Sequence, residues 1–444
     1  MRKSGKRKIS AGTVAVLLMT MAILGGTVFV WLRLSSGKTV DLSRLKPEVE
    51  ILQVKTGNEE RIPEIAQTVM STPIPVATQT PEPNNPEKND PEPDLRSFTL
   101  TAAGTVSMAG EVRKNSYSSD AKQYDYSDTM TLLKKELGSD LNIVFTENLY
   151  STENKPTDLI APDAAAAMLK SAGFNAAACG YSKAFDKGEA GIASTRRVLE
   201  DNGIRPVGIY ENDGEDHIPV FSENGIRTAL LQYTDTIPAA TRKTMTKNGL
   251  SSTVPAADTE AIAADIARAR ELGCEAVIVL LNWGKTGRGP DKNMKKLVQG
   301  IADAGADLII GSGNRIVSGM EMLTAGETGR QVPCVWSLGT TLSGDRGTIK
   351  RIAGMLLKAT VVVKDGETEI REIRYVPLYT WKYRQDSRYY YRCLAADRPE
   401  PDGMDSEQRK MMKKAAETVR EAMKDSPAEE HSIEGTAKGN PQTS

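Results

Sequence analysis

Histidine is nearly absent from this 444-residue chain, which contains only two, His217 and His431. A zinc, manganese or iron centre built from several imidazole ligands is therefore excluded almost from the start. A surplus of charge is missing as well, because 57 Lys and Arg residues face 58 Asp and Glu residues for a formal net charge of −1. That balance argues against a nucleic-acid partner held by bulk charge. The hydrophobic fraction of 39% is below the usual globular level, so part of the chain is expected to pack no core.

Cysteine is scarce too, and the four cysteines show no Cys-x-x-Cys spacing. Three of them lie in or beside apolar segments, which favours buried thiols over metal ligands or disulfides. The four are Cys179, Cys274, Cys334 and Cys393. Near them in sequence, Trp381 and the run 389–391 of three tyrosines predict the packing of an edge strand, with a sugar-stacking surface as the alternative.

Charged side chains are missing altogether from residues 9–32, which follow a basic cluster in residues 1–8. As a helix this segment would span roughly 36 Å, enough for a hydrocarbon core of about 30 Å. A cleaved signal peptide has a shorter apolar core, so we predict an uncleaved transmembrane signal-anchor, with cleavage as the alternative. The basic flank predicts a cytoplasmic amino end and an extracellular main domain, hence a single-pass protein of the cell membrane.

Proline is concentrated just after this segment, with seven residues between positions 71 and 94. Proline fixes φ and removes a hydrogen-bond donor, so residues 33–94 are predicted to form a membrane-proximal segment and an extended, Pro-rich extracellular stalk. Residues 398–444, at the other end, are polar and charged. We predict a largely disordered tail there, with a short helix over 405–424.

Between these segments, residues 95–397 alternate short apolar runs with helical patterns. Several runs are apolar on consecutive residues, which is typical of strands buried on both faces. Each predicted helix ends just before a glycine, a common helix terminator. We predict strands over 98–103, 142–145, 228–232, 276–281, 308–310 and 334–336, and helices over 162–172, 191–201, 259–272 and 293–304.

This alternation predicts an α/β fold, a layered sandwich with mixed sheets. The pattern changes after residue 352 to two longer strands, 355–363 and 369–377. Asp365 and Gly366 lie between them, and Asp-Gly is a strong signal for a tight hairpin. An antiparallel edge of the sheet is therefore expected near the end of the domain.

Ligands of such folds bind in the loops beyond the carboxyl ends of the strands. Six loops of this chain occupy such places: 103–108, 146–149, 179–188, 281–284, 311–315 and 337–340. Taken in order, they resemble the loops of the bacterial capsule-synthesis (CapA-type, poly-gamma-glutamate biosynthesis) family, a family of the calcineurin-like metallophosphatase fold. The resemblance covers residues 98–379. It implies a metallophosphatase-like sandwich and, in intact members, two metal ions bound by these loops.

The loops differ from the family's pattern at the positions where the resemblance implies metal ligands. The family's Gly-Asp is Gly104-Thr105 here, and its His-Trp-Gly is Asn282-Trp283-Gly284. The other departures are Asn148-Leu149-Tyr150 for Asn-Leu-Glu, Tyr181-Ser182-Lys183 for Asn-Asn-His, Gly311-Ser312-Gly313-Asn314-Arg315 for Gly-His-His-Pro-His, and Ser337-Leu338-Gly339-Thr340 for Ser-Leu-Gly-Asn. Hydroxyls are poor metal ligands, and a protonated lysine or arginine cannot ligate. We therefore expect a degenerate member with no metal, no other cofactor and no catalytic residue.

Two sets of residues define the predicted site. The degenerate cleft comprises Thr105, Glu147, Asn148, Ser182, Lys183, Asp186, Asn282, Ser312, Asn314 and Arg315. The cations that replace or flank the ligands predict an anion-binding cleft, because guanidinium and ammonium groups bind carboxylates and phosphates. These cations are Lys183, Lys285, Arg288, Arg315 and Arg346. The alternative is a set of solvated loop charges neutralised by Glu147, Asp186 and Asp345.

The resemblance implies a role in making a surface polymer. We predict a membrane-anchored extracellular accessory protein of capsule, poly-gamma-glutamate or cell-wall polymer biosynthesis, a pseudoenzyme that binds an anionic polymer or partner biosynthesis proteins. One alternative is a metal-dependent hydrolase of phosphoester or gamma-glutamyl bonds with the non-standard ligands Glu147, Asn148 and Asp186. The other alternative is a protein–protein scaffold.

Overall fold

The computed structural model describes residues 95–431 apart from 154, 213–216, 252 and 386. All of them belong to one compact unit. The predicted cytoplasmic flank (1–8), signal-anchor (9–32) and stalk (33–94), and the last residues of the tail (432–444), lie outside the described residues. No helix within the described part has the length and apolar character needed to cross a bilayer.

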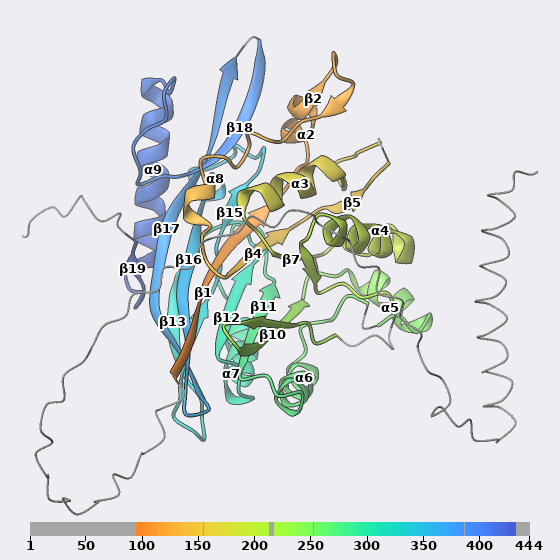
Figure 1. Cartoon of the computed structure of the whole chain (residues 1–444), viewed down its shortest axis with the longest axis vertical. Coiled ribbons are helices and arrows are strands. Elements are labelled where there is room, and N and C mark those ends of the chain that lie inside the picture. Colours follow the sequence, from red (N-terminus) through yellow and green to blue (C-terminus); the bar gives the residue numbers. More distant parts are fainter. Residues whose placement is uncertain (1–94, 154, 213–216, 252, 386, 432–444) are drawn as a thin grey trace, which may run out of the picture. The chain divides into compact units, whose positions relative to one another are not determined.

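The first of two large sheets is mixed (Figure 1). Its parallel half and its antiparallel half meet where β1 pairs with β16. In spatial order its main strands are β18 (Arg388–Ala395), β17 (Glu367–Gln385), β16 (Ala353–Lys364), β1 (Leu95–Val106), β4 (Leu141–Thr146), β7 (Ala176–Ala178) and β8 (Arg205–Val207). The short β15 (Thr340–Leu342) pairs with β1, and β19 (Glu429–Glu430) pairs with β17.

The second sheet has a parallel centre and two antiparallel edges. Its strands are, in spatial order, β13 (Met320–Thr324), β14 (Gln331–Val335), β12 (Leu308–Ser312), β11 (Ala276–Asn282), β10 (Ile226–Thr234) and β9 (Val220–Glu223). All seven residues of β11 are buried, as expected for a parallel strand that is covered on both faces.

Three apolar clusters define the layers. The first contains side chains of both sheets, among them Leu100 of β1 and Ile278 of β11, so the sheets pack face to face. The second covers the other face of the first sheet with α3 (Asp163–Ala172) and α4 (Gly188–Asp201). The third covers the other face of the second sheet with α6 (Thr259–Glu271) and α7 (Lys292–Asp303). The prediction of a layered α/β sandwich with mixed sheets is confirmed.

The six predicted strands and four predicted helices are all present, with boundaries that differ by a few residues. Gly203, Gly273 and Gly305, three of the glycines that follow these helices, have positive φ angles of 69°, 76° and 105°, which explains the glycine after each helix. The hairpin prediction is also confirmed, because Asp365 and Gly366 both have positive φ angles between β16 and β17.

The helix predicted near the carboxyl end is α9 (Ser406–Met423), and it begins at the capping box of Asp405 and Gln408. The prediction that residues after 397 form a tail outside the domain is wrong for residues 398–431. Met412, Val419 and Met423 of α9 are buried in the first cluster. The helix packs against β16 and β17 of the first sheet (Figure 1). The polar composition concealed this role because only one face of the helix is apolar.

The remaining elements have two to nine residues and were not predicted, since such short segments carry little periodicity. They are α2 (Glu111–Ser116), β2 (Tyr117–Ser118), β3 (Gln123–Tyr124), the 3₁₀ turn η2 (Lys134–Glu136), β5 (Leu149–Ser151), β6 (Ile160–Pro162), α5 (Ala239–Lys247) and α8 (Ile349–Ile352).

All four cysteines are free and buried, as predicted from their apolar surroundings. The tyrosine run lies on β18, at the end of the first sheet. Trp381 stacks on Tyr383 at 4.3 Å between ring centroids, and Tyr383 stacks on Tyr390 at 5.4 Å. These rings therefore pack an edge strand, as predicted, while Tyr389 remains 40% exposed.

Candidate functional site

The predicted cleft lies where β1 and β4 of one sheet and β11 and β12 of the other end. Thr105, near the end of β1, and Ser312, the last residue of β12, are fully buried. Their hydroxyl oxygens are 3.1 Å apart and form a hydrogen bond. The structure therefore brings these two predicted residues together across the two sheets.

Gly104 permits a close contact between β1 and the segment before β15. A Cβ at position 104 would lie 2.3 Å from the carbonyl oxygen of Gly339, closer than real Cβ atoms come to backbone. The amide of Thr105 donates to that same oxygen at 2.9 Å. Glycine at 104 is thus a requirement of the close contact between β1 and the segment before β15, whatever the chemistry of the site.

Glu147 and Arg315 form an ion pair between the loops that follow β4 and β12. The side chain of Glu147 is 12% exposed and that of Arg315 is 25% exposed. Arg315 has a φ angle of 62°, and its carbonyl oxygen accepts a hydrogen bond from Thr340 at 3.2 Å. The carboxylate of Glu147 therefore neutralises the guanidinium of Arg315. This agrees with the alternative interpretation, in which acidic residues neutralise the loop cations.

Asn148 is fully buried and acts as a structural bridge. Its Oδ1 accepts a hydrogen bond from the amide of Met108 at 2.7 Å, and its Nδ2 donates to the carbonyl of Asp158 at 3.4 Å. The side chain joins the loop after β1 to the loop before β6. One of the two lone pairs of its oxygen is therefore used in a structural contact.

The two asparagines of the second sheet are also engaged. The Oδ1 of Asn314 accepts from Ser337 at 2.6 Å and from the amide of Ile316 at 3.1 Å. Its Nδ2 donates to Ser318 at 3.0 Å and to the carbonyl of Arg288 at 2.9 Å. The Oδ1 of Asn282 accepts from Thr236 at 3.3 Å.

Sequence reasoning missed the partners Thr236, Ser318 and Ser337. Of these, only Ser337 carried a signal, since it opens one of the six loops. Thr236 and Ser318 lie in segments that no motif marks. Each supplies a hydroxyl to an asparagine of the predicted cleft.

Ser182, Lys183 and Asp186 lie in consecutive turns after β7. The amide of Ala184 donates to Tyr181 and that of Asp186 donates to Lys183, both at 3.0 Å. Ser182 is half-buried, whereas Lys183 and Asp186 are exposed. Burial raises the pKa of the Tyr181 phenol, and the charges of Glu147 and Asp186 raise it further.

The predicted cations differ in their surroundings. Lys183, Lys285 and Arg288 are exposed. Arg346 lies against the antiparallel edge, where its Nη1 donates to the carbonyl of Thr380 at 2.8 Å and its guanidinium lies 5.2 Å from the Tyr391 ring centroid. Burial lowers the pKa of Arg346.

Arg315 borders a cavity of about 370 Å³ that is acidic rather than basic. Three carboxylates line it: Glu111, Asp158 and Asp345. Asp158 pairs with Arg113, and Asp345 pairs with Arg351. The prediction of one basic cleft around Arg315 is therefore not met by this cavity.

The residues present do not fit the dinuclear metal centre that the resemblance implies for intact members. The matched positions offer hydroxyls and amides that are hydrogen-bonded to one another, and a carboxylate that pairs with Arg315. Across the described residues, no three His, Cys, Asp or Glu side chains gather closely enough to hold a metal ion. This set of donors lacks the anionic or imidazole ligands that a two-metal site needs.

Comparison with known proteins gives the family. Among solved structures, a phosphatase from Mycoplasma pneumoniae is 14% identical with a TM-score of 0.38, and the match covers 64% of this chain and 94% of that one. The calcineurin-like phosphoesterase YfkN from Bacillus subtilis is 11% identical with a TM-score of 0.38, covering 74% and 99%.

Sequence relatives are more informative. The capsule biosynthesis protein CapA of Bacillus anthracis is 24% identical over 241 residues, which cover 52% of this chain and 57% of CapA. The chain thus matches little more than half the length of that relative. Residues 99–345 match the family model described as bacterial capsule synthesis protein PGA_cap, and they make up more than half of the chain. The chain belongs to the bacterial capsule synthesis protein family, PGA_cap.

Proposed function

We propose that this chain is an accessory protein of capsule, poly-gamma-glutamate or cell-wall polymer assembly that performs no metal-dependent catalysis. Family membership supports the capsule-related role. One observation carries the non-catalytic part: several side chains of the predicted cleft are hydrogen-bonded or ion-paired to other side chains of the site. Thr105 bonds to Ser312, Asn314 to Ser337, and Glu147 to Arg315.

The electrostatics of the site support the same proposal. A hydrolase of this kind stabilises negative charge with metal ions and generates its nucleophile from metal-bound water. Arg315 supplies one positive charge in that region, but Glu147 neutralises it. The site therefore offers neither a set of anionic ligands for a cation nor a free cation of its own that is buried.

The proposed location is the outer face of the cell membrane. Residues 9–32 contain no charged side chain and follow a basic flank, and seven prolines separate them from the domain. An anchored domain on an extended stalk would meet surface polymers outside the cell. We infer contact with anionic polymer through the exposed cations Lys183, Lys285 and Arg288, which attract polyanions in a salt-dependent manner.

Metal analysis of the purified full chain, grown with added manganese, tests the proposal. We expect well below one metal ion per chain, together with no manganese-dependent release of phosphate or of glutamate from γ-linked peptides. Two bound ions per chain and a hydrolysis rate that is lost in Glu147→Gln would overturn it. That result would favour the hydrolase that uses Glu147, Asn148 and Asp186 as ligands.

A further inference from the structure

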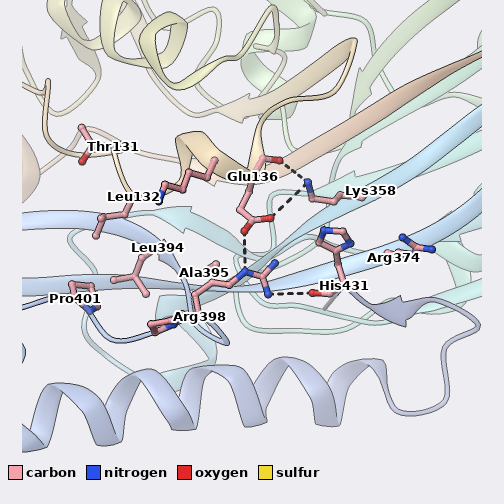
Figure 2. A pocket seen from close by; sticks show the side chains of 12 residues that line it. Thr131, Leu132, Glu136, Lys358, Arg374, Leu394, Ala395, Arg398, Pro401 and His431 are labelled. Atoms are coloured by element: carbon pink, nitrogen blue, oxygen red, sulfur yellow. Dashed lines mark hydrogen bonds and ion pairs between the residues drawn. The ribbon is translucent and has the colours of Figure 1, made fainter. Parts of the chain in front are cut away.

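A second cavity, away from the six loops, has a volume of about 810 Å³ and lies between η2, the strands β16 and β17, and the segment after β18 (Figure 2). Lys358 of β16 pairs with Thr101 in the middle of β1, so this cavity lies back from the strand ends that form the predicted site. Six ionisable residues line it: Lys135, Glu136, Lys358, Arg374, Arg398 and His431.

Glu136 organises the inner wall of this cavity. Its Oε1 accepts a hydrogen bond from the Nε of Arg398 at 2.9 Å, and its Oε2 lies 3.7 Å from the Nζ of Lys358. Lys358 also donates to the carbonyl oxygen of Glu136 at 2.7 Å. Figure 2 shows both cations converging on this one carboxylate. The inner wall is thus fixed by residues from three segments that are far apart in sequence.

Arg398 is oriented by further contacts. Its Nη1 donates to Asp397 at 2.5 Å and to the carbonyl of His431 at 3.2 Å. Its Nη2 is buried and has no hydrogen-bond partner among the described residues. A buried donor without an acceptor is unfavourable, and more so when the group is charged. The guanidinium is therefore held in place by Glu136, Asp397 and His431, and its Nη2 lacks an acceptor.

Positive charge exceeds negative charge on the cavity wall. Four cations line it, against the single carboxylate of Glu136. Lys135 and Arg374 are exposed at the rim, and no ion pair joins either of them to another residue of the described part. Glu429 is the register partner of Arg374 on β19 but makes no such pair. The carboxylate of Asp397 pairs with Arg398, and Asp397 does not line the cavity.

The same wall carries apolar side chains. Leu132, Leu394 and Pro401 line the cavity together with the cations (Figure 2). Leu132 is one of the few large hydrophobic residues with substantial exposure, at 38%. An oriented guanidinium, surplus cations and apolar contacts are together the features of a site for an anion that has a carbon skeleton.

We propose that this cavity binds the carboxylate or phosphate group of an organic anion, with Arg398 and Lys358 on the oxyanion, Lys135 and Arg374 at the rim, and Leu132 against the ligand's carbon atoms. The inference goes beyond the proposed function and stands without it, because none of these residues belongs to the six loops. The competing interpretation is a purely structural cluster in which Glu136 ties η2 to β16 and the rim charges are solvated.

Calorimetric titration of the full chain tests the proposal with two probes, a γ-linked glutamate oligomer and glycerol phosphate. The first presents carboxylates and the second a phosphate, so the tighter probe identifies the preferred group. We expect binding that weakens with added salt and that falls about tenfold in each of Arg374→Glu and Lys135→Glu. The matched control is Lys364→Glu, which reverses the charge of an exposed lysine at the far end of β16.

Arg398→Gln removes the oriented donor and should abolish binding. Its unfolding temperature must be measured in parallel, since this residue also supports Glu136. The rim variants keep the test decisive if Arg398→Gln does not fold. The proposal is overturned if neither probe binds at millimolar concentration, or if Arg374→Glu and Lys135→Glu bind as tightly as Lys364→Glu. Neither result bears on the metal content of the protein, which tests the proposed function separately.

Discussion

The Oγ1 of Thr105 lies 3.1 Å from the Oγ of Ser312, and this hydrogen bond joins β1 of the first sheet to β12 of the second. Both side chains are fully buried. In the pattern that the loops resemble, an acidic residue stands at the first position and an imidazole at the second. In this chain two hydroxyls stand at these positions and form a hydrogen bond with each other. A neutral contact therefore joins the two sheets at this point.

Thr105→Asp tests that substitution directly. The new carboxylate would be buried beside Ser312 with no cation to compensate it, so we expect the free energy of unfolding to fall by about 2 kcal/mol or more. Addition of Mn²⁺ should not recover the loss, since the neighbouring residues offer no further anionic or imidazole ligands. Urea denaturation with and without the metal measures both effects.

Thr105→Val is the control for shape, because it removes the hydroxyl without adding a charge. We expect a loss of about 1 kcal/mol, the usual value for one hydrogen bond. A stability of Thr105→Asp that rises with Mn²⁺ while the wild type and Thr105→Val do not respond would contradict the account of the site as unable to hold a metal.

The ion pair of Arg315 and Glu147 predicts a large effect from the loss of one partner. Arg315→Met leaves Glu147, which is 12% exposed, without its cation, and we expect a loss of roughly 1–3 kcal/mol of stability. The double variant Arg315→Met with Glu147→Gln should recover most of it. Arg288→Met, which removes an exposed cation nearby, is the comparison. Equal stabilities of Arg315→Met and Arg288→Met would show that the pair is not formed.

Asp397 predicts a dependence of stability on pH. Burial raises the pKa of its carboxyl to about 6, although Arg398 acts in the opposite direction. Between pH 4 and pH 6 the folded chain therefore retains a proton that the unfolded chain releases. The free energy of unfolding should fall as the pH rises through this window. Asp397→Asn should flatten the fall, as measured by unfolding midpoints between pH 4 and pH 7. A slope identical to that of the wild type would refute the assignment.

Much of the layered core could be predicted from the sequence, because long apolar runs and glycine-terminated helices are local signals. β11 is an example, with seven consecutive buried residues that read as one apolar run. The tight turn at Asp365 and Gly366 could also be predicted, since a turn with two successive positive φ angles favours that dipeptide. Short strands such as β7 and β8 depend on pairing with distant strands and leave no local pattern.

The candidate site was harder to predict, because its residues were identified but their partners were not. Glu147 and Arg315 are separated by 168 positions, and their pairing depends on how two sheets align. The cavity around Arg398 was missed for the same reason. Lys358 lies among apolar residues in the middle of β16, and only the fold brings Glu136 to it.

Variants of α9 distinguish a helix that packs on the domain from a helix in a detached tail. Val419 of α9 is fully buried in the first apolar cluster, whereas Lys413 on the same helix is exposed. Val419→Asp would place an unpaired carboxylate in that core, and we expect a loss of about 3 kcal/mol or more. Lys413→Asp, on the solvent side, should change stability by no more than about 0.5 kcal/mol. Urea denaturation of the two variants decides between the alternatives, because a helix in a detached tail would give two small and equal effects.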